Sequence, residues 1–436
     1  MKKHLIAAAL STLCTTAVWA AEPTLEEKVQ ILQDELDALK AQMAQMTKPA
    51  AQSNTASLPA PLRADSPSSI ITTAPSAIVN AGPATTIGGY GELNYNRYSN
   101  NGRNSEADLR RFVLFFGHRF NDSLRFVSEL ELEHGVTSAS DAGETEIEQA
   151  YLDYRFNDAV NVKAGLFLIP LGLLNETHEP PTYYGVERNE VETRIIPTTW
   201  REGGIGVFGE VAPGLRYDLG ITTGFNSGKE ADPATGYREW HQEMSLSRAH
   251  DLSVYAALNY RGIPGLLVGG GIFSGNTGQN GYTDRTTPQQ PLLAGVSARL
   301  TLWDIHAKYA IGKLELQGLY ARGNLGDAGI VSAAESAVAG KNVAVAKSLY
   351  GWYGQAAYHV WQFGDYDLAP FVRYEKYNTQ QTVADGYSAD PLNNERVVTT
   401  GFNFKVHPQV VLKADYQKYK ADNSKDRFDL GVGYMF

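Results

Sequence analysis

The feature that most constrains this chain is an alternation of apolar and polar side chains that begins near Ile87 and runs to the C-terminus. Successive side chains of a β-strand point to opposite faces, so a period of two residues predicts strands with one apolar face and one polar face. The last segment shows this best, with Phe428, Leu430, Val432, Tyr434 and Phe436 separated by Asp429, Gly431, Gly433 and Met435.

The same period predicts a series of sixteen strands. Their expected ranges are 87–98, 108–120, 123–134, 145–156, 160–169, 203–211, 215–225, 251–261, 266–275, 291–309, 313–323, 348–360, 366–378, 395–406, 410–420 and 427–436. Apart from a heptad pattern at residues 21–48, the sequence shows no helical pattern that could cover the apolar faces of these strands.

The connections between these segments alternate largely between short and long. Short ones such as 121–122 and 407–409 carry turn residues, whereas 170–202 and 226–250 are long. A soluble sandwich has no reason to sort its loops in this way. An outer-membrane barrel has one, since short periplasmic turns and long external loops join an even number of strands. We therefore predict an all-β fold, a 16-stranded antiparallel transmembrane barrel with both termini in the periplasm.

The composition agrees with a barrel and excludes other classes. The chain has 436 residues, is 43% hydrophobic and has a mean hydropathy of -0.29. Such averages fit a barrel whose apolar residues alternate with polar ones. After the N-terminus there is no run of roughly 18 apolar residues, so a helical membrane protein is excluded. The formal net charge of -10 argues against a nucleic-acid partner, because phosphate binding needs a basic face.

Residues 1–20 are typical of a signal peptide. Lys2 and Lys3 precede a short apolar run, and Val18-Trp19-Ala20 offers small residues for cleavage after Ala20. The single cysteine of the chain, Cys14, lies in this segment. The mature protein is therefore expected to be exported without disulfides.

Two further segments precede the barrel, which we expect at 87–436. Residues 21–48 carry an apolar heptad seam, which predicts a periplasmic coiled-coil helix for oligomerisation; a single amphipathic helix on its own domain is the alternative, and the number of helices stays open. Residues 49–86 are rich in Pro, Ala and Ser and predict a flexible linker. The heptad seam comprises Leu25, Val29, Leu32, Leu36, Leu39, Met43 and Met46.

Several short motifs resemble a known family. The terminal Tyr434-Met435-Phe436 resembles the last strand of outer-membrane barrels. Together, Gly89-Tyr90-Gly91-Glu92, Arg110-Arg111-Phe112, Leu166-Phe167-Leu168-Ile169-Pro170 and Trp200-Arg201-Glu202-Gly203-Gly204 resemble the phosphate- and polyphosphate-selective porin (O/P) family. This resemblance implies a homotrimeric diffusion channel of sixteen strands. It further implies a third external loop that narrows the lumen, with arginines and lysines that bind anions.

The loop at 170–202 is the candidate constriction, because it is unusually apolar for an external loop. It holds three arginines and six glutamates. We expect Arg188, Arg194, Arg201, Glu187 and Glu190 to line the narrow part of the pore, since anion selectivity needs basic side chains in a narrow channel. Strand parity adds candidate residues on the lumen wall: Arg111, Arg125, Lys163, Arg299, Arg373, Lys413, Glu129 and Glu131.

These observations predict an outer-membrane porin, a water-filled channel for small anionic or neutral solutes with some preference for anions such as phosphate. Because the loop is net acidic and the lumen mixed, a general or dicarboxylate-type porin remains an alternative. A structural barrel tethered to the cell wall through its coiled coil is another. We expect outer-membrane lipid and two further copies of the chain as partners. The histidines show no catalytic or metal-ligand spacing, so we expect no enzyme, no metal and no cofactor.

Overall fold

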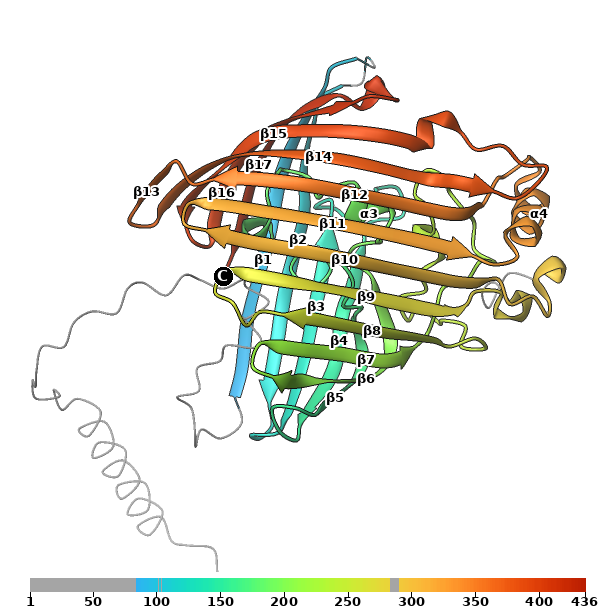
Figure 1. Ribbon diagram of the computed structural model, residues 1–436, viewed down its shortest axis with the longest axis horizontal. Coiled ribbons are helices and arrows are strands. Elements are labelled where there is room, and N and C mark those ends of the chain that lie inside the picture. The colour runs from blue at the N-terminus through green and yellow to red at the C-terminus, as the bar shows by residue number, and fades with distance from the viewer. Residues whose placement is uncertain (1–83, 101, 103, 283–289) are drawn as a thin grey trace, which may run out of the picture. The chain divides into compact units, whose positions relative to one another are not determined.

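The strands form one antiparallel sheet that closes on itself. The computed structural model describes residues 84–436 except 101, 103 and 283–289. The expected signal peptide, coiled coil and most of the linker lie outside the described residues. The barrel closes because β1 pairs with β2 on one side and with β17 on the other (Figure 1). Closure leaves no sheet edge, which is the condition for spanning a membrane with strands.

Seventeen strands are labelled in the sheet. Because the short β13 and the end of β12 both pair with β14, these two share one position and the barrel has sixteen, as predicted. The strands are β1 (Ala84–Tyr98), β2 (Glu106–Arg119), β3 (Leu124–Glu133), β4 (Thr145–Arg155), β5 (Asn161–Leu168), β6 (Arg201–Ala212), β7 (Leu215–Thr222), β8 (Ser253–Tyr260), β9 (Leu266–Asn276), β10 (Arg299–Ile311), β11 (Leu314–Leu325), β12 (Ala346–Tyr358), β13 (Trp361–Phe363), β14 (Tyr366–Val383), β15 (Asn394–His407), β16 (Val410–Tyr419) and β17 (Arg427–Met435).

The alternation of short and long connections is confirmed, and the two kinds of connection lie at opposite ends of the barrel. The long loops gather at one end with α4, while β13 and the C-terminus lie at the other (Figure 1). Four expected boundaries differ from the structure by three residues or more. β7 ends at Thr222 rather than 225, and β14 ends at Val383 rather than 378. β1 begins at Ala84 rather than 87. β10 begins at Arg299 rather than 291, because Pro291 starts a 3-10 turn and Ala298 has a positive φ of 44°.

The expectation that no helix follows the heptads is wrong. The loop between β11 and β12 contains α4 (Ala328–Ala339), whose alanines favour a helix. It ends at Gly340, where a φ of 62° suits glycine. No helix in the described ranges is long and apolar enough to cross a membrane. The remaining short elements are α3 (Val191–Arg194), η1 (Pro180–Thr182), η2 (Arg238–Trp240), η3 (Gln279–Gly281), η4 (Pro291–Leu293), η5 (Pro391–Asn393) and η6 (Asn423–Lys425).

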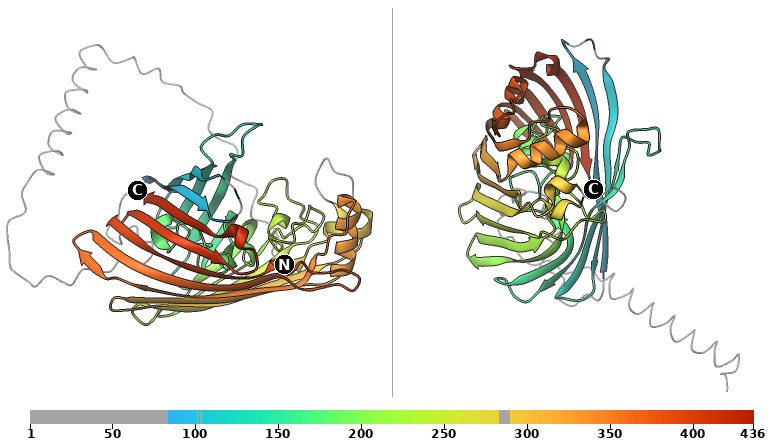
Figure 2. Two further views of the ribbon diagram at one scale, coloured as in Figure 1. Left: turned by 90° about the horizontal axis from the view of Figure 1, so that it is seen from above. Right: turned by 90° about the vertical axis from the view of Figure 1, so that its right-hand side faces the viewer.

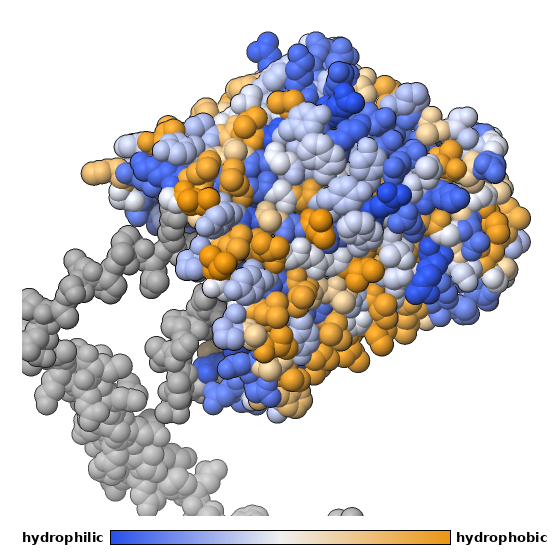
Figure 3. All heavy atoms as spheres, viewed as in Figure 1, coloured by the Kyte–Doolittle hydropathy of each residue, from blue (hydrophilic) through white to orange (hydrophobic). Residues whose placement is uncertain are grey.

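The outer face of the barrel is apolar. On β17, Phe428 and Val432 are 40% and 41% exposed, whereas Asp429 between them is fully buried. Apolar side chains gather over the lower middle of the view, where Figure 1 labels β7 to β9 (Figure 3). Leu219 of β7 and Ile272 of β9 are exposed. An outward apolar face is what a bilayer requires of a barrel.

The interior of the barrel also holds an apolar core, to which the loops contribute. Segments of the middle of the chain lie inside the ring of strands (Figure 2). Trp200 is fully buried there, with its ring 4.5 Å from that of Phe273 and 5.0 Å from that of Phe225. Leu300 and Leu302 of β10 face the same core, whereas the strand parity that placed Arg299 in the lumen turns them outward. Loops therefore fill part of the lumen.

Candidate functional site

The loop of residues 169–200, between β5 and β6, runs inside the barrel; we call it the internal loop. Basic side chains of the wall bind its carbonyl groups. Arg373 of β14 donates from Nη1 to the carbonyl oxygen of Tyr184 over 3.0 Å. Lys413 of β16 donates from Nζ to the carbonyl of Gly185 over 2.8 Å. Both cations were expected to face the lumen, and both are used to hold the loop.

Acidic side chains of the wall hold the loop in the complementary way. Each accepts a hydrogen bond from a backbone N–H of the internal loop, which satisfies a buried donor and a buried carboxylate together. The pairs are Gly172 with Asp304 (3.0 Å), Val186 with Asp415 (2.6 Å) and Val191 with Glu375 (3.2 Å). The course of the loop is therefore fixed from at least three strands.

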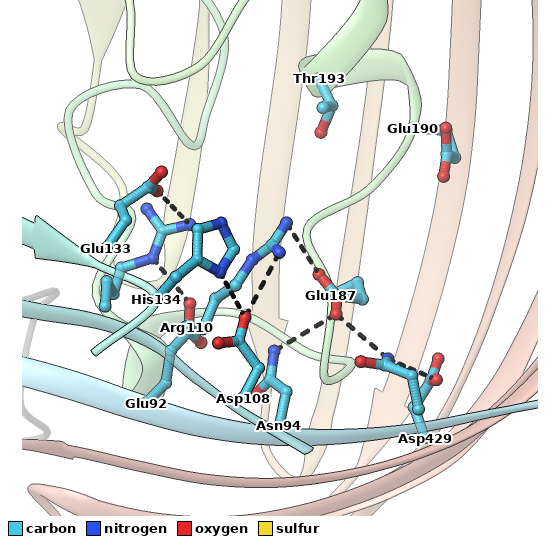
Figure 4. A network of polar contacts seen from close by, with 12 residues as sticks. Glu92, Asn94, Asp108, Arg110, Glu133, His134, Glu187, Glu190, Thr193 and Asp429 are labelled. Atoms are coloured by element: carbon cyan, nitrogen blue, oxygen red, sulfur yellow. Dashed lines mark hydrogen bonds and ion pairs between the residues drawn. The ribbon is translucent and has the colours of Figure 1, made fainter. Parts of the chain in front are cut away.

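Glu187, at the tip of the loop, lies in a polar network with β1 and β2 (Figure 4). Its carboxylate accepts hydrogen bonds from Asn94 (3.3 Å) and Asn96 (3.2 Å), and Arg110 lies 4.0 Å away. Burial alone would raise the pKa of Glu187. Arg110, Arg427 and the two amides outweigh burial and hold this pKa below its usual value. Glu187 is thus a charged anchor.

Glu190, at the N-cap of α3, forms an ion pair with Arg194, the last residue of this helix. The Tyr419 hydroxyl donates to Glu190 over 2.6 Å, and Arg194 Nη1 donates to the carbonyl of Ala234 over 3.1 Å. Burial would raise the pKa of Glu190, but Arg194 lowers it to about 2. The pair joins the internal loop to β16 and to the loop between β7 and β8, so Arg194 is largely neutralised.

Arg201 begins β6 and is only 3% exposed. Its Nη2 lies 2.5 Å from a Glu146 carboxylate oxygen and 3.3 Å from one of Glu243. Two carboxylates therefore neutralise this arginine, and it is held away from any solute.

Arg188 differs from Arg194 and Arg201 because none of the described carboxylates lies within ion-pair distance of it. It is half-buried, and its Nε and Nη2 are buried without a hydrogen-bond partner in the part of the chain that the structure describes. Arg238, from the loop between β7 and β8, has a pKa lowered by burial and by the positive charge of Arg188. Arg238 donates through Nη1 to the Thr198 carbonyl over 2.5 Å. The two guanidinium groups thus lie close enough to repel each other, and Arg188 has donors to spare.

Most of the remaining wall residues are paired inside the barrel. Arg111 binds Glu92 over 2.9 Å and Glu131 over 3.3 Å. The other internal pairs are Arg125 with Asp153, Lys163 with Asp218 (2.6 Å) and Glu129 with Gln149 (2.8 Å).

The expected position of Arg299 is wrong. It is exposed on the face of β10 that also carries exposed Ile305, while Leu300 faces the interior. Strand parity was assigned on the assumption that apolar residues face lipid. At this end of β10 they face the apolar loops inside. Arg238 was missed for a related reason, because a loop has no period that shows which side chains point inward.

The closed sheet, its apolar outer face and its inward-folded loop define a porin, a channel of the outer membrane. The chain belongs to the phosphate-selective porin O and P family, whose model matches residues 87–430. Family and fold indicate a channel rather than an enzyme, and they place it in the outer membrane.

Individual proteins resemble this chain in sequence or in fold. A relative from Aquifex aeolicus (strain VF5) with the name uncharacterized protein is 32% identical over 363 residues, which cover 80% of each chain. Salmonella typhi OmpF in complex with daunomycin is 15% identical at a TM-score of 0.55, covering 81% of this chain and 98% of its own. An anion-selective porin from Comamonas acidovorans is 12% identical at a TM-score of 0.52, covering 81% and 100%. The two solved structures share the fold.

Proposed function

We propose that the channel prefers small anions such as phosphate, and that Arg188 and Arg238 form the anion-binding pair of its constriction. The observation that carries this proposal is the pair of buried, unsatisfied donors on Arg188 beside a second guanidinium. A planar guanidinium with free N–H groups binds phosphate or carboxylate oxygens well. The other cations expected in the constriction already have carboxylate or carbonyl partners.

The preference is expected to be weak to moderate. Many acidic side chains line the same lumen, and Glu179 and Glu187 lie on the internal loop itself. Those that hold arginines and backbone N–H groups are neutralised locally, so they repel an anion less than isolated carboxylates would. A channel of this kind passes neutral solutes and anions with modest discrimination.

Reversal potentials across planar bilayers under a KCl gradient test the proposal. We expect the intact protein to favour chloride, phosphate to block the chloride current, and R188Q to weaken both effects. R299Q is the matched control, because Arg299 is exposed on the outer face and its loss should leave selectivity unchanged. Clear cation selectivity of the intact channel would contradict the anion preference. Equal selectivity of R188Q and the intact protein would remove Arg188 from the site.

We also propose that residues 1–20 are removed on export, that residues 21–48 form a coiled coil in the periplasm, that residues 49–86 link it to the barrel, and that the protein is a homotrimer. The heptad seam and the family resemblance support this arrangement. Deletion of residues 21–83 should leave single-channel conductance intact and lower the stability of the trimer, as measured by light scattering in detergent. A barrel that conducts nothing would favour the structural role instead.

A further inference from the structure

Three side chains from separate elements meet beside the internal loop. Glu129 comes from β3, Glu148 from β4 and His178 from the loop, and one ligand atom of each lies within 4.8 Å of the others. Glu148 is fully buried and His178 is 3% exposed, whereas Glu129 is half-buried. The group is therefore enclosed by protein, with Glu129 as its more accessible member.

The orientation of His178 is fixed by a backbone carbonyl of the internal loop. Its Nδ1 lies 3.0 Å from the carbonyl oxygen of Asn175, which can only accept, so Nδ1 carries the proton of this hydrogen bond. Nε2 is then the free ring nitrogen. It is buried, finds no hydrogen-bond partner among the residues described, and lies 3.7 Å from a carboxylate oxygen of Glu148. This tautomer is the one that presents a lone pair to a metal ion.

The distances suit an ion better than a direct contact. A separation of 3.7 Å is too long for a hydrogen bond between His178 and Glu148. Two ligand atoms on a tetrahedral ion, each about 2.0–2.1 Å from it, lie about 3.3 Å apart. The two side chains are thus spaced nearly as ligands of one ion would be.

The charge around these residues also calls for a cation. Glu148 Oε1 and Glu179 Oε2 are buried, and neither has a hydrogen-bond partner within the described ranges. Glu131 is buried beside them and shares Arg111 with two other carboxylates. Buried carboxylates need compensating charge. A proton on His178 would allow an ion pair with Glu148 at 3.7 Å, but it would leave Glu148 Oε1 and Glu179 Oε2 buried without a hydrogen-bond donor.

We propose that Glu129, Glu148 and His178 bind one divalent transition-metal ion, with Zn²⁺ as the best fit. One imidazole and two carboxylates match zinc, whereas Mg²⁺ and Ca²⁺ prefer oxygen ligands alone. Neighbouring side chains orient the ligands: Gln149 donates to Glu129 over 2.8 Å, and Tyr90 donates to Glu148 over 3.3 Å. The ion ties the internal loop to β3 and β4.

The test is zinc binding to the full-length protein purified in detergent and stripped with EDTA. Calorimetry and elemental analysis should show one Zn²⁺ per chain. H178Q and E148Q keep the size of the side chains and should each weaken binding about tenfold or more. H241Q is the matched control: His241 is also buried with an unpartnered Nε2, but Glu243, 3.5 Å from its Nδ1, is the single carboxylate paired with it.

A spectroscopic measurement separates binding at this site from a merely structural effect. Co²⁺ should replace Zn²⁺ and give visible absorption bands of a four- or five-coordinate ion, which H178Q removes and H241Q keeps. Unchanged thermal unfolding of metal-free H178Q shows that the variant is folded. The proposal is overturned if the intact protein binds no Zn²⁺, if H178Q and E148Q bind it as the intact protein does, or if Ca²⁺ and Mg²⁺ bind more tightly.

Discussion

The ammonium group of Lys413 donates a hydrogen bond to the carbonyl of Gly185, 2.8 Å away, and lies 3.6 Å from the centre of the Tyr183 ring. Gly185 has a φ of 91°, a conformation that glycine adopts without strain. The lysine therefore holds the internal loop where its chain turns. A residue that was expected to attract anions is in this structure part of the support of the constriction.

Replacing Lys413 with methionine should loosen the internal loop without emptying the space beside Tyr183. The Gly185 carbonyl would lose a charged partner, an effect of about 1.5–3 kcal/mol on the stability of the loop. We expect larger and noisier single-channel currents and a lower unfolding temperature. K418M is the control, since Lys418 lies on the exposed face of the same strand. Identical current noise in the two variants would show that Lys413 does not restrain the loop.

Trp200 supports the same loop from its other end. It is fully buried, its backbone N–H donates to Asn175 Oδ1 over 2.7 Å, and its ring packs on Phe225 and Phe273. W200A should destabilise the protein by about 3–5 kcal/mol because it leaves a large cavity. Denaturant unfolding in detergent measures this loss. W352A, which removes a 39% exposed tryptophan of the outer face, should have a much smaller effect in the same assay.

The barrel could be predicted from the sequence because a membrane imposes a simple pattern on strands. Asp429, between exposed Phe428 and Leu430, follows this pattern. The pattern fails where loops replace water inside the barrel. Leu300 is apolar and faces inward, so the parity rule placed its neighbour Arg299 in the lumen by mistake.

The site could be predicted only in outline. The apolar composition of the loop indicated that it packs inside the barrel. Which of its charges stay available depends on residues far along the chain. Arg201 is neutralised by Glu146 and Glu243, while the charge of Arg188 acts on Arg238 from a different loop. Loop residues have no fixed period, so these encounters are decided by tertiary packing alone.

His241 gives the channel a stability that depends on pH. Burial lowers the pKa of this histidine from 6.5 to about 4, so it is neutral in the folded protein at pH 7. The unfolded chain takes up its proton at higher pH than the folded one does. Stability should therefore fall as the pH drops from about 6.5 to about 4, and level off below that range for this group. H241Q should remove this decrease in unfolding temperature between pH 7 and pH 5.

Protonation of Glu190 should affect the channel at lower pH than protonation of His241 does. Its folded pKa of about 2 lies below the usual 4.5, so its contribution is fully present above pH 4.5 and is lost as the pH falls towards 2. Protonation breaks the ion pair with Arg194 and the hydrogen bond from Tyr419, so α3 should loosen. We expect current noise to increase in the intact channel near pH 3, and E190Q to show the same increase already at pH 7. E230Q is the control, because Glu230 is exposed. If E190Q is quiet at pH 7 and becomes as noisy in acid as the intact channel, the acid effect belongs to another group.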